Sequence, residues 1–210
     1  PLVNRGLIAH GNRVEKKIAL TFDLCQTEKG KAGFDSEIVR ILVETKTPAT
    51  FFMGGLWIRD HMAEMLVLAG NPLFELGNHS WSHPDFSRIT PEKMTEEIQQ
   101  TQSIMGKFLG YQPNLFRFPY GRYSENALDV IAENGLYAVQ WDVASGDPDP
   151  AVDADKMTTW VLRRIKPGSI VVMHANGRGW HTAEALTVII PSLQEKGYIF
   201  VTISKLLSGQ

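Results

Sequence analysis

The sequence contains little cysteine, no long apolar run and almost no net charge. Its one cysteine, Cys25, excludes an internal disulfide, so cysteine content does not indicate the cellular compartment. No apolar run approaches the roughly 18 residues that a membrane span needs. The formal net charge of -2 lacks the basic excess of nucleic-acid-binding proteins. We therefore expect no nucleic-acid partner and no membrane span, and nothing in the sequence implies a protein partner.

The composition is that of a globular domain. Hydrophobic residues make up 43% of the 210 residues and charged residues 21%. This length suffices for one sizeable core, so we predict a single catalytic domain over residues 1–210. The chain starts at Pro1 without an apolar leader, which we interpret as either a trimmed chain or a processed mature form.

Short apolar or β-branched runs alternate with segments of helical spacing. Strands that alternate with helices imply parallel pairing, because parallel neighbours need a crossover connection. A full eight-stranded barrel usually needs about 250 residues, so we predict an α/β fold with a distorted, short (β/α)7-8 barrel. A doubly wound open sheet is the alternative. The predicted strands span residues 18–24, 49–54, 74–78, 115–119, 137–143, 170–174 and 198–203.

The clearest predicted helix spans residues 91–109. Its start is marked by Thr90 followed by Pro91, because threonine is a good N-cap and proline suits the first helical position. Its apolar residues follow a period near 3.6: they are Met94, Ile98, Met105 and Phe108. Further expected helix caps are Ser124 and Thr182, and glycines expected at helix ends are Gly110, Gly135 and Gly197.

Most of the predicted strands are followed by ionisable side chains. In a β/α barrel the carboxyl ends of the strands carry the active site. Five of the seven predicted strands place such groups at this one rim, which indicates an enzyme. The residues are Asp23, His79, His83, Arg117, Tyr120, Asp142, Asp147 and His174.

His79 and His83 are candidate metal ligands. Their spacing of four residues allows both imidazoles to face one cation on a helical turn or tight loop. Neutral imidazole is a good ligand for zinc and related ions. The alternative is one structural histidine and one surface histidine. The other ionisable residues of the same rim favour the metal site.

Three further residues suggest acid–base chemistry. Asp23 is either a loop carboxylate or a general base that takes a proton from a metal-activated water. Arg117 lies between two phenylalanines, which indicates burial, and a buried arginine needs an anionic partner such as Asp23. His174 is either a core histidine or a general acid, because its ordinary pKa of about 6.5 suits proton donation near neutrality.

Five ordered motifs resemble those of the polysaccharide deacetylase family, which has the NodB homology domain and forms carbohydrate esterase family 4. The resemblance covers residues 18–204. The motifs are "TFDLCQ" in place of a Thr-Phe-Asp-Asp run, "HSWSH", "RFPYG", "WDVASGDP" and "IVVMHA".

The resemblance implies a distorted β/α barrel that hydrolyses acetyl groups on glycans. We expect a divalent metal cofactor, with zinc as the favoured ion. The resemblance also implies residue roles. Asp23 would be the base, Arg117 would tune it and Asp147 would hold Arg117. His174 would be the acid. The remaining implied roles are metal binding by His79 and His83, oxyanion stabilisation by the N–H of Tyr120, and an acetyl-methyl pocket at Val172.

The sequence departs from the family pattern at several places. Leu24 occupies the position of the metal-binding aspartate, and leucine cannot bind a metal. A similar "TFDLC" variant looks like a recurring branch of the family. The third ligand could be water or the thiolate of Cys25, although a lone cysteine is commonly buried filler. Asp35 and Asp85 are the other candidates. The remaining departures are Ala144, Pro148 and Ala175.

Several conspicuous residues are not assigned a single role. We expect His10 and His61 at the surface. His181 is either an ordinary loop residue or borders the pocket with Trp180, which we predict to contact substrate. Trp57 and Trp81 either stack on sugar rings or pack in the core, and Asp142 could replace Asp147 as the partner of Arg117.

The expected function is metal-assisted hydrolysis that removes acetyl groups from N-acetylated amino sugars of a peptidoglycan- or chitin-like polysaccharide. One alternative is a metal-independent cyclic amide or imide hydrolase of the same fold, suggested by Leu24. The other is a catalytically inactive carbohydrate-binding domain. The resemblance alone implies export to the periplasm, cell envelope or exterior.

Overall fold

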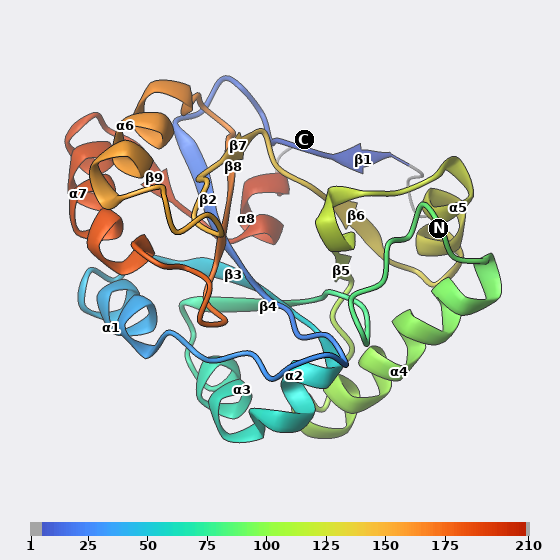
Figure 1. Ribbon diagram of the computed structural model, residues 1–210. Helices are drawn as coiled ribbons and strands as arrows, with labels where there is room; N and C mark the ends of the chain where they lie inside the picture. Colours follow the sequence, from blue (N-terminus) through green and yellow to red (C-terminus); the bar gives the residue numbers. More distant parts are fainter. Residues whose placement is uncertain (1–5, 209–210) are drawn as a thin grey trace.

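Strands and helices alternate along residues 6–208, the part of the chain that the computed structural model describes (Figure 1). The strands are β1 (Leu7–Ile8), β2 (Lys17–Leu24), β3 (Ala49–Met53), β4 (Phe74–Asn78), β5 (Leu115–Phe116), β6 (Tyr137–Val139), β7 (Val143–Ala144), β8 (Ile170–His174) and β9 (Ile199–Phe200). The helices are α1 (Ser36–Glu44), α2 (Gly55–Asp60), α3 (Met62–Ala69), α4 (Pro91–Leu109), the 3-10 helix η1 (Pro119–Gly121), α5 (Glu125–Glu133), α6 (Ala154–Arg164), α7 (Thr182–Glu195) and α8 (Ile203–Leu207).

The sheet is parallel and strongly curled. Its strand order is β1-β6-β5-β4-β3-β2-β8-β7, with β9 paired to β2. Only residues 140–142 separate β6 from β7, although the two strands lie near opposite edges of the sheet. That connection spans at most about 14 Å, so the sheet must curl back on itself. The predicted distorted barrel is confirmed as a half-barrel surrounded by helices (Figure 1).

Three strand predictions were wrong in detail. The run 115–119 gives only the short β5, because the 3-10 helix η1 begins at Pro119. The run 137–143 was expected to be one strand, but it divides into β6 and β7, which pair with different neighbours. The run 198–203 gives only the short β9, because α8 begins at Ile203. β1 was not predicted, since two residues carry no periodic signal.

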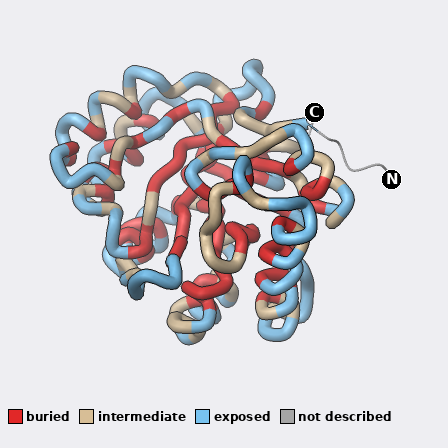
Figure 2. Tube along the Cα trace, turned by 45° about the vertical axis from the view of Figure 1, so that its right-hand side comes forward, coloured by how far each residue is buried: buried red, intermediate tan, exposed pale blue. Residues whose placement is uncertain are grey.

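Strand β2 separates the barrel interior from the helical layer. Its alternate residues point to opposite faces, as in any strand. Thr21 and Asp23 point inward and contact Arg117 inside the barrel. The outward residues pack with helix residues in the main hydrophobic cluster: they are Ile18, Leu20, Phe22 and Leu24. Figure 2 shows these central strands as buried and the outer faces of the helices as exposed.

The predicted helix over residues 91–109 is confirmed as α4. The Thr90 hydroxyl accepts a hydrogen bond from the Lys93 N–H, and Gly110 ends the helix with a φ of 75°. Met94, Ile98 and Met105 are buried as expected, whereas Phe108 is 39% exposed.

Other helix boundaries agree in part with the sequence prediction. Ser124 caps α5 by accepting from the Ala127 N–H. Thr182 is not a cap but the first residue of α7, and its hydroxyl bonds elsewhere. Gly135 and Gly197 follow α5 and α7 with positive φ, as expected. Within residues 6–208 no helix has the length and apolarity to cross a membrane.

Candidate active site

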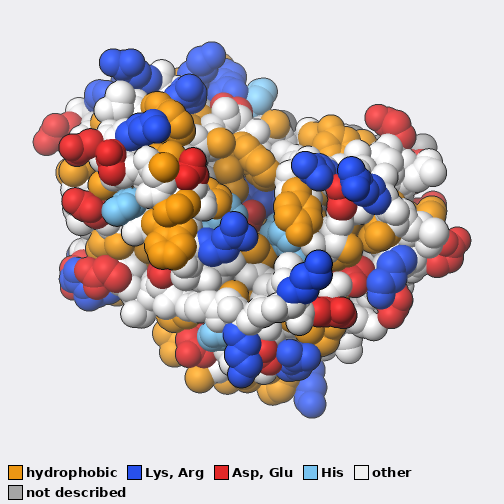
Figure 3. All heavy atoms as spheres, in the orientation of Figure 1, with side chains coloured by type: hydrophobic (Ala, Val, Ile, Leu, Met, Phe, Trp, Pro, Cys, Tyr) orange, Lys and Arg blue, Asp and Glu red, His pale blue; other side chains and the backbone are white. Residues whose placement is uncertain are grey.

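A cavity of about 360 Å³ opens at the carboxyl ends of the strands. Asp23, His79, His83, Tyr120 and His174 all line it, which places these five predicted residues together. Asp147, Val172 and Cys25 also line it. Figure 3 shows this face hollowed near its centre, with histidine side chains visible in the hollow and hydrophobic and basic side chains around it.

Asp23 and Arg117 form a buried ion pair inside the barrel. The Nη1 atom of Arg117 donates to Asp23 Oδ1 at 2.8 Å, and the exposures of the two residues are 0% for Arg117 and 5% for Asp23. Burial alone would raise the pKa of Asp23, but the charge and hydrogen bond of Arg117, together with the charge of His174, outweigh it and lower the pKa. Asp23 is therefore ionised at neutral pH.

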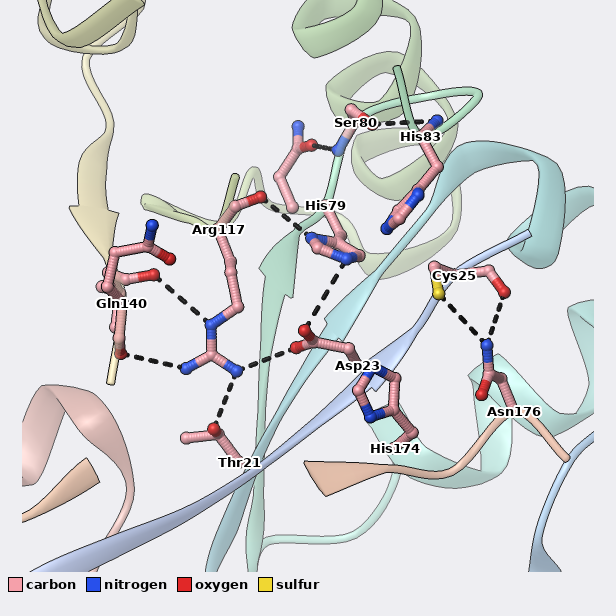
Figure 4. Close-up of polar contacts among 12 residues, drawn as sticks. Thr21, Asp23, Cys25, His79, Ser80, His83, Arg117, Gln140, His174 and Asn176 are labelled. Carbon is pink, nitrogen blue, oxygen red and sulfur yellow. Dashed lines mark hydrogen bonds and ion pairs between the residues drawn. The ribbon is translucent and has the colours of Figure 1, made fainter. Parts of the chain in front are cut away.

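Every other contact of Arg117 comes from uncharged groups. Its guanidinium donates to the Thr21 hydroxyl and to the carbonyls of Val139 and Gln140, and it lies 4.1 Å from the ring centre of Phe52. These contacts fix the fork of Arg117 so that one nitrogen faces Asp23 (Figure 4). The Thr21 hydroxyl in turn donates to the Val171 carbonyl.

The predicted contact between Asp147 and Arg117 is wrong. Asp147 instead accepts hydrogen bonds from the Nδ1 atom of His174 at 2.9 Å, from the backbone N–H of His174 and from the Thr182 hydroxyl. Pairing of β7 with β8 brings the loop after β7 alongside the end of β8, which explains the contact. Asp142 is not the partner of Arg117 either, because it bonds to Arg13 and Ser169.

Asp147 sets the charge state of His174. Burial would lower the pKa of His174, but the hydrogen bond and charge of Asp147 outweigh burial and raise it. A carboxylate can only accept, so Nδ1 carries the proton and Nε2 is the atom left for other partners. Asp147, which the sequence analysis assigned to Arg117, therefore holds the predicted acid His174.

His79 and His83 present imidazole nitrogens to the cavity. The Nδ1 atom of His79 donates to the Arg117 carbonyl at 2.9 Å, which leaves Nε2 without a proton. That Nε2 atom lies 3.7 Å from Asp23 Oδ2, and the two imidazole rings are 4.9 Å apart. Burial lowers the pKa of both histidines, that of His83 to about 3. Both rings are therefore neutral and suited to bind a cation.

The backbone at the cavity adopts unusual conformations. Ser80, His83 and Tyr120 have φ values of 66°, 62° and 58°. Left-handed backbone is uncommon for residues other than glycine and costs free energy, so it persists where surrounding contacts enforce it. Here it turns the chain sharply after β4 and at η1, which places the Tyr120 ring 4.4 Å from the His83 ring.

Glu97 of α4 holds the loop that carries the two histidines. Its carboxylate accepts from the backbone N–H groups of Trp81 and Ser82 and from the Ser82 hydroxyl, at 2.7–2.9 Å. Glu97 is 1% exposed. Sequence reasoning missed this residue, although a glutamate between Met94 and Ile98 on the apolar face of a predicted helix is a usable signal.

We expect Glu97→Ala to lower the free energy of unfolding by about 2 kcal/mol, because it leaves two backbone donors without their acceptor. Urea denaturation measures this effect. Glu96→Ala on the exposed face of the same helix is the matched control and should change stability by less than about 0.5 kcal/mol. Equal effects of the two variants would contradict the role of Glu97.

Cys25 lies on the cavity side of the β2 end. Its sulfur and the ligand nitrogens of His79 and His83 all lie within 4.8 Å of one another. The Asn176 amide donates to the Cys25 sulfur at 3.1 Å and to its carbonyl at 2.7 Å. Burial raises the pKa of the Cys25 thiol to about 12.

Leu24, at the position of the family's metal-binding aspartate, is fully buried in the main hydrophobic cluster. The other two candidates for a third ligand, Asp35 and Asp85, have partners elsewhere. Asp35 accepts from the Gly177 N–H, and Asp85 accepts from Ser87 and Arg122. Over residues 6–208, Cys25, His79 and His83 form the one cluster with the spacing of a metal site.

The remaining conspicuous residues lie outside the cavity lining. Trp57 is fully buried, donates to the Gly33 carbonyl and stacks on His61, so it packs in the core. Trp81 packs over Gly55. Trp180, a predicted substrate contact, is 57% exposed. His10 is exposed, whereas His61 and His181 are half-buried.

Sequence reasoning also missed two residues that line the cavity, Trp141 and Arg178. Trp141 follows the β6 run, and its ring lies 5.5 Å from the Arg117 guanidinium. Arg178 belongs to the glycine-rich loop after β8. A basic residue in a glycine-rich loop at the active rim was the available signal.

A carboxylate–guanidinium pair, a carboxylate–imidazole pair and two neutral histidines thus meet at the carboxyl ends of a β/α half-barrel. The family model for polysaccharide deacetylase matches residues 10–139. The chain belongs to the polysaccharide deacetylase family, as the motifs predicted.

Named relatives and solved structures agree with this placement. The chain is 32% identical over 189 residues to a peptidoglycan-N-acetylglucosamine deacetylase of Bacillus cereus, covering 89% of this chain and 66% of that protein. The crystal structure of the Bc1960 peptidoglycan N-acetylglucosamine deacetylase superimposes with a TM-score of 0.89 at 30% identity, covering 97% of this chain and 94% of the other.

Two further structures bear on catalysis and on metal binding. A family 4 pseudoenzyme from Bacillus anthracis, BA3943, superimposes with a TM-score of 0.87 at 25% identity and covers 98% of this chain and 70% of its own. A family 4 acetyl xylan esterase from Clostridium thermocellum, crystallised with a cobalt ion, gives a TM-score of 0.76 at 28% identity and coverages of 90% and 89%. The chain spans 39–66% of the length of the first three curated relatives that it matches.

Proposed function

We propose that this protein is a metal-assisted hydrolase that removes acetyl groups from N-acetylated amino sugars of a peptidoglycan- or chitin-like glycan. The observation that carries the proposal is the convergence of Asp23, His79, His83 and His174 on one cavity. An ionised base, two neutral imidazole ligands and an imidazole held by a carboxylate are groups that can support metal-assisted amide hydrolysis. The deacetylase names of several relatives support the substrate class.

The donor atoms of the site fit a divalent cation. The backbone carbonyl that holds His79 Nδ1 is the outer contact that orients metal-binding histidines in proteins. His79 and His83 would hold the ion, and zinc is the ion that imidazole donors favour. When bound, such an ion polarises the substrate carbonyl and lowers the pKa of an attacking water.

Asp23 acts as the general base in this proposal. Its Oδ1 atom is occupied by Arg117, whereas Oδ2 faces the cavity beside His79. Oδ2 therefore takes the proton of the attacking water. Arg117 keeps Asp23 ionised and oriented because their hydrogen bond is buried and charge-assisted.

His174 acts as the general acid and protonates the leaving amine through Nε2. Asp147 keeps its Nδ1 atom protonated and its ring oriented. The backbone N–H of Tyr120 donates to the oxyanion that forms on the substrate carbonyl. Val172, which lines the cavity, packs against the acetyl methyl group.

Acetate release from N-acetylglucosamine oligomers and from purified peptidoglycan tests the function. Release from either glycan that a chelator abolishes and zinc restores is the expected result. Release that survives exhaustive chelation would favour the metal-independent amide or imide hydrolase suggested by Leu24. The site supplies neutral histidines in place of further acid–base groups, and this favours the metal-assisted reaction.

A catalytically inactive glycan-binding domain is the second candidate. The pseudoenzyme of the same fold makes it a real alternative. Glycan binding by the zinc-loaded protein without acetate release would establish it. The buried Asp23–Arg117 pair counts against it, because a binding protein gains nothing from an ionised carboxylate held beneath the cavity.

We expect Asp147→Asn to move the alkaline limb of the pH–rate profile to lower pH by about 1 unit. The general acid must be protonated, so activity falls as pH rises through the pKa of His174. Asp147 raises that pKa, and its removal therefore lowers it. Asp149→Asn, an exposed carboxylate of the same loop, is the control and should leave the limb in place. An unchanged limb in Asp147→Asn would contradict the assignment of His174.

Export to the cell envelope or exterior follows from the proposed substrate, because peptidoglycan and chitin-like glycans lie outside the cytoplasm. The peptidoglycan deacetylase names of relatives support this location. A single catalytic domain over residues 1–210 is part of the same proposal, supported by structural superposition over 97% of the chain.

A further inference from the structure

We propose that the sulfur of Cys25 is the third protein ligand of the metal, so that this chain replaces a carboxylate ligand at position 24 with a thiolate at position 25. The inference rests on the metal site of the proposed function. It concerns which atoms complete that site, and not whether His79 and His83 belong to it.

Cys25, and not Leu24, faces the cavity at the end of β2. Strand β2 ends at Leu24, and Cys25 is the first residue after it. Asp23 and Cys25 both line the cavity, whereas Leu24 is fully buried among helix residues. Position 25, and not position 24, can therefore supply a further ligand beside the two histidines.

The possible ligand atoms of Cys25, His79 and His83 lie close together. Cys25 Sγ and the ligand nitrogens of His79 and His83 lie within 4.8 Å of one another. Ligands of tetrahedral zinc at 2.0–2.3 Å lie about 3.5 Å apart, so the observed spacing needs only small side-chain rotations. Figure 4 shows His79 and His83 close together, with Cys25 on the neighbouring segment after β2 and its sulfur facing the Asn176 amide.

The Asn176 side chain donates a hydrogen bond to the Cys25 sulfur. Its Nδ2 atom donates to the Cys25 carbonyl at 2.7 Å, and this fixes the amide so that the same nitrogen also faces Sγ at 3.1 Å. A donor aimed at sulfur stabilises a thiolate more than a thiol, as outer contacts do for metal ligands. Asn176 is 2% exposed, so this contact is shielded from water.

The replacement keeps the charge of the ligand set and changes its softness. A thiolate carries the same single negative charge as the carboxylate it replaces, and its proton passes to solvent when the metal binds. Asp23 Oδ1 is committed to Arg117, and Oδ2 has the separate role of base in the proposed reaction. Two imidazoles and a thiolate favour zinc and cobalt over magnesium and calcium, which prefer oxygen ligands.

Cobalt binding tests the inference directly. The metal-free protein is titrated with Co²⁺, and the expected result is a near-ultraviolet sulfur-to-cobalt charge-transfer band that saturates at one ion per chain. Cys25 is the only cysteine, so no other thiol can produce the band. Cys25→Ser should abolish the band and weaken zinc binding at least about tenfold, which corresponds to about 1.4 kcal/mol.

X-ray absorption of the zinc-loaded, unmodified protein gives a second test that does not depend on how the variant folds. One sulfur neighbour at about 2.3 Å is expected. Zinc with only nitrogen and oxygen neighbours, together with an unchanged affinity in Cys25→Ser, would overturn the inference.

The two proposals fail in different ways. If His83→Ala loses cobalt while the unmodified protein binds it without a charge-transfer band, the histidine site stands and the thiolate ligand is refuted. If the unmodified protein binds neither cobalt nor zinc, the metal-assisted function and the thiolate ligand are both refuted.

Discussion

Asp23→Asn is expected to lower the turnover rate for acetate release by two to four orders of magnitude, the usual contribution of a general base. The amide has the shape of the carboxylate and keeps an oxygen for Arg117, but it cannot take a proton from water. Turnover is measured with zinc-loaded enzyme at saturating substrate. Metal content is determined for the same preparation, so that loss of metal and loss of the base are distinguished.

The matched control is Asp142→Asn, an aspartate that also follows a strand but bonds to Arg13 and Ser169 away from the cavity. It should leave turnover within about twofold of the unmodified enzyme, because surface changes away from the site have small effects. A fall of less than tenfold in Asp23→Asn, with metal content intact, would contradict the role of Asp23 as the base.

Arg117→Met is expected to destabilise the fold by about 3–5 kcal/mol, because it leaves the Asp23 carboxylate buried without its charged partner. The side-chain exposures are 0% for Arg117 and 7% for Asp23, so water does not take over the contact. Urea denaturation at neutral pH measures the loss. The difference in unfolding free energy between the unmodified protein and Arg117→Met should become smaller as the pH falls toward about 4. Without Arg117, Asp23 takes up a proton more readily and no longer leaves a buried charge.

Arg122→Met is the control for this variant. Arg122 pairs with Asp85 at 3.1 Å, but its side chain is 60% exposed. Exposed pairs contribute about 0–1 kcal/mol, so the control should differ little from the unmodified protein. In the double variant Asp23→Asn, Arg117→Met the buried charge is gone, and part of the lost stability should return. A double variant as unstable as the sum of the single ones would contradict the charge explanation.

The sequence predicted which residues lie together at the cavity better than it predicted their contacts. Asp23, His79, His83 and His174 lie at or beyond the carboxyl ends of their strands, so the carboxyl-end rule for β/α barrels places them together. The contact of Asp147 with His174 could not be predicted in this way, because it depends on the pairing of β7 with β8. Asp147 lies 27 residues from His174, and no periodicity in the sequence encodes that approach.

The same limit explains what was missed in the fold. The run 137–143 looks like one strand, but the chain leaves β6 and joins the other part of the curled sheet at β7. The strand propensity of residues 137–143 does not distinguish one continuous strand from two short ones. The curvature of the whole sheet divides this run into β6 and β7. Glu97 was missed for a related reason, since only the tertiary structure shows that its buried carboxylate meets the N–H groups of the histidine loop.

The most direct test of the central claim is acetate release from N-acetylglucosamine oligomers, measured on one preparation before chelation, after chelation and after addition of zinc. We expect acetate release that is lost on chelation and restored by zinc, and no restoration in His79→Ala. Unchanged release after complete removal of metal would contradict metal assistance, and no release from oligomers or peptidoglycan by fully zinc-loaded protein would contradict the deacetylase function itself.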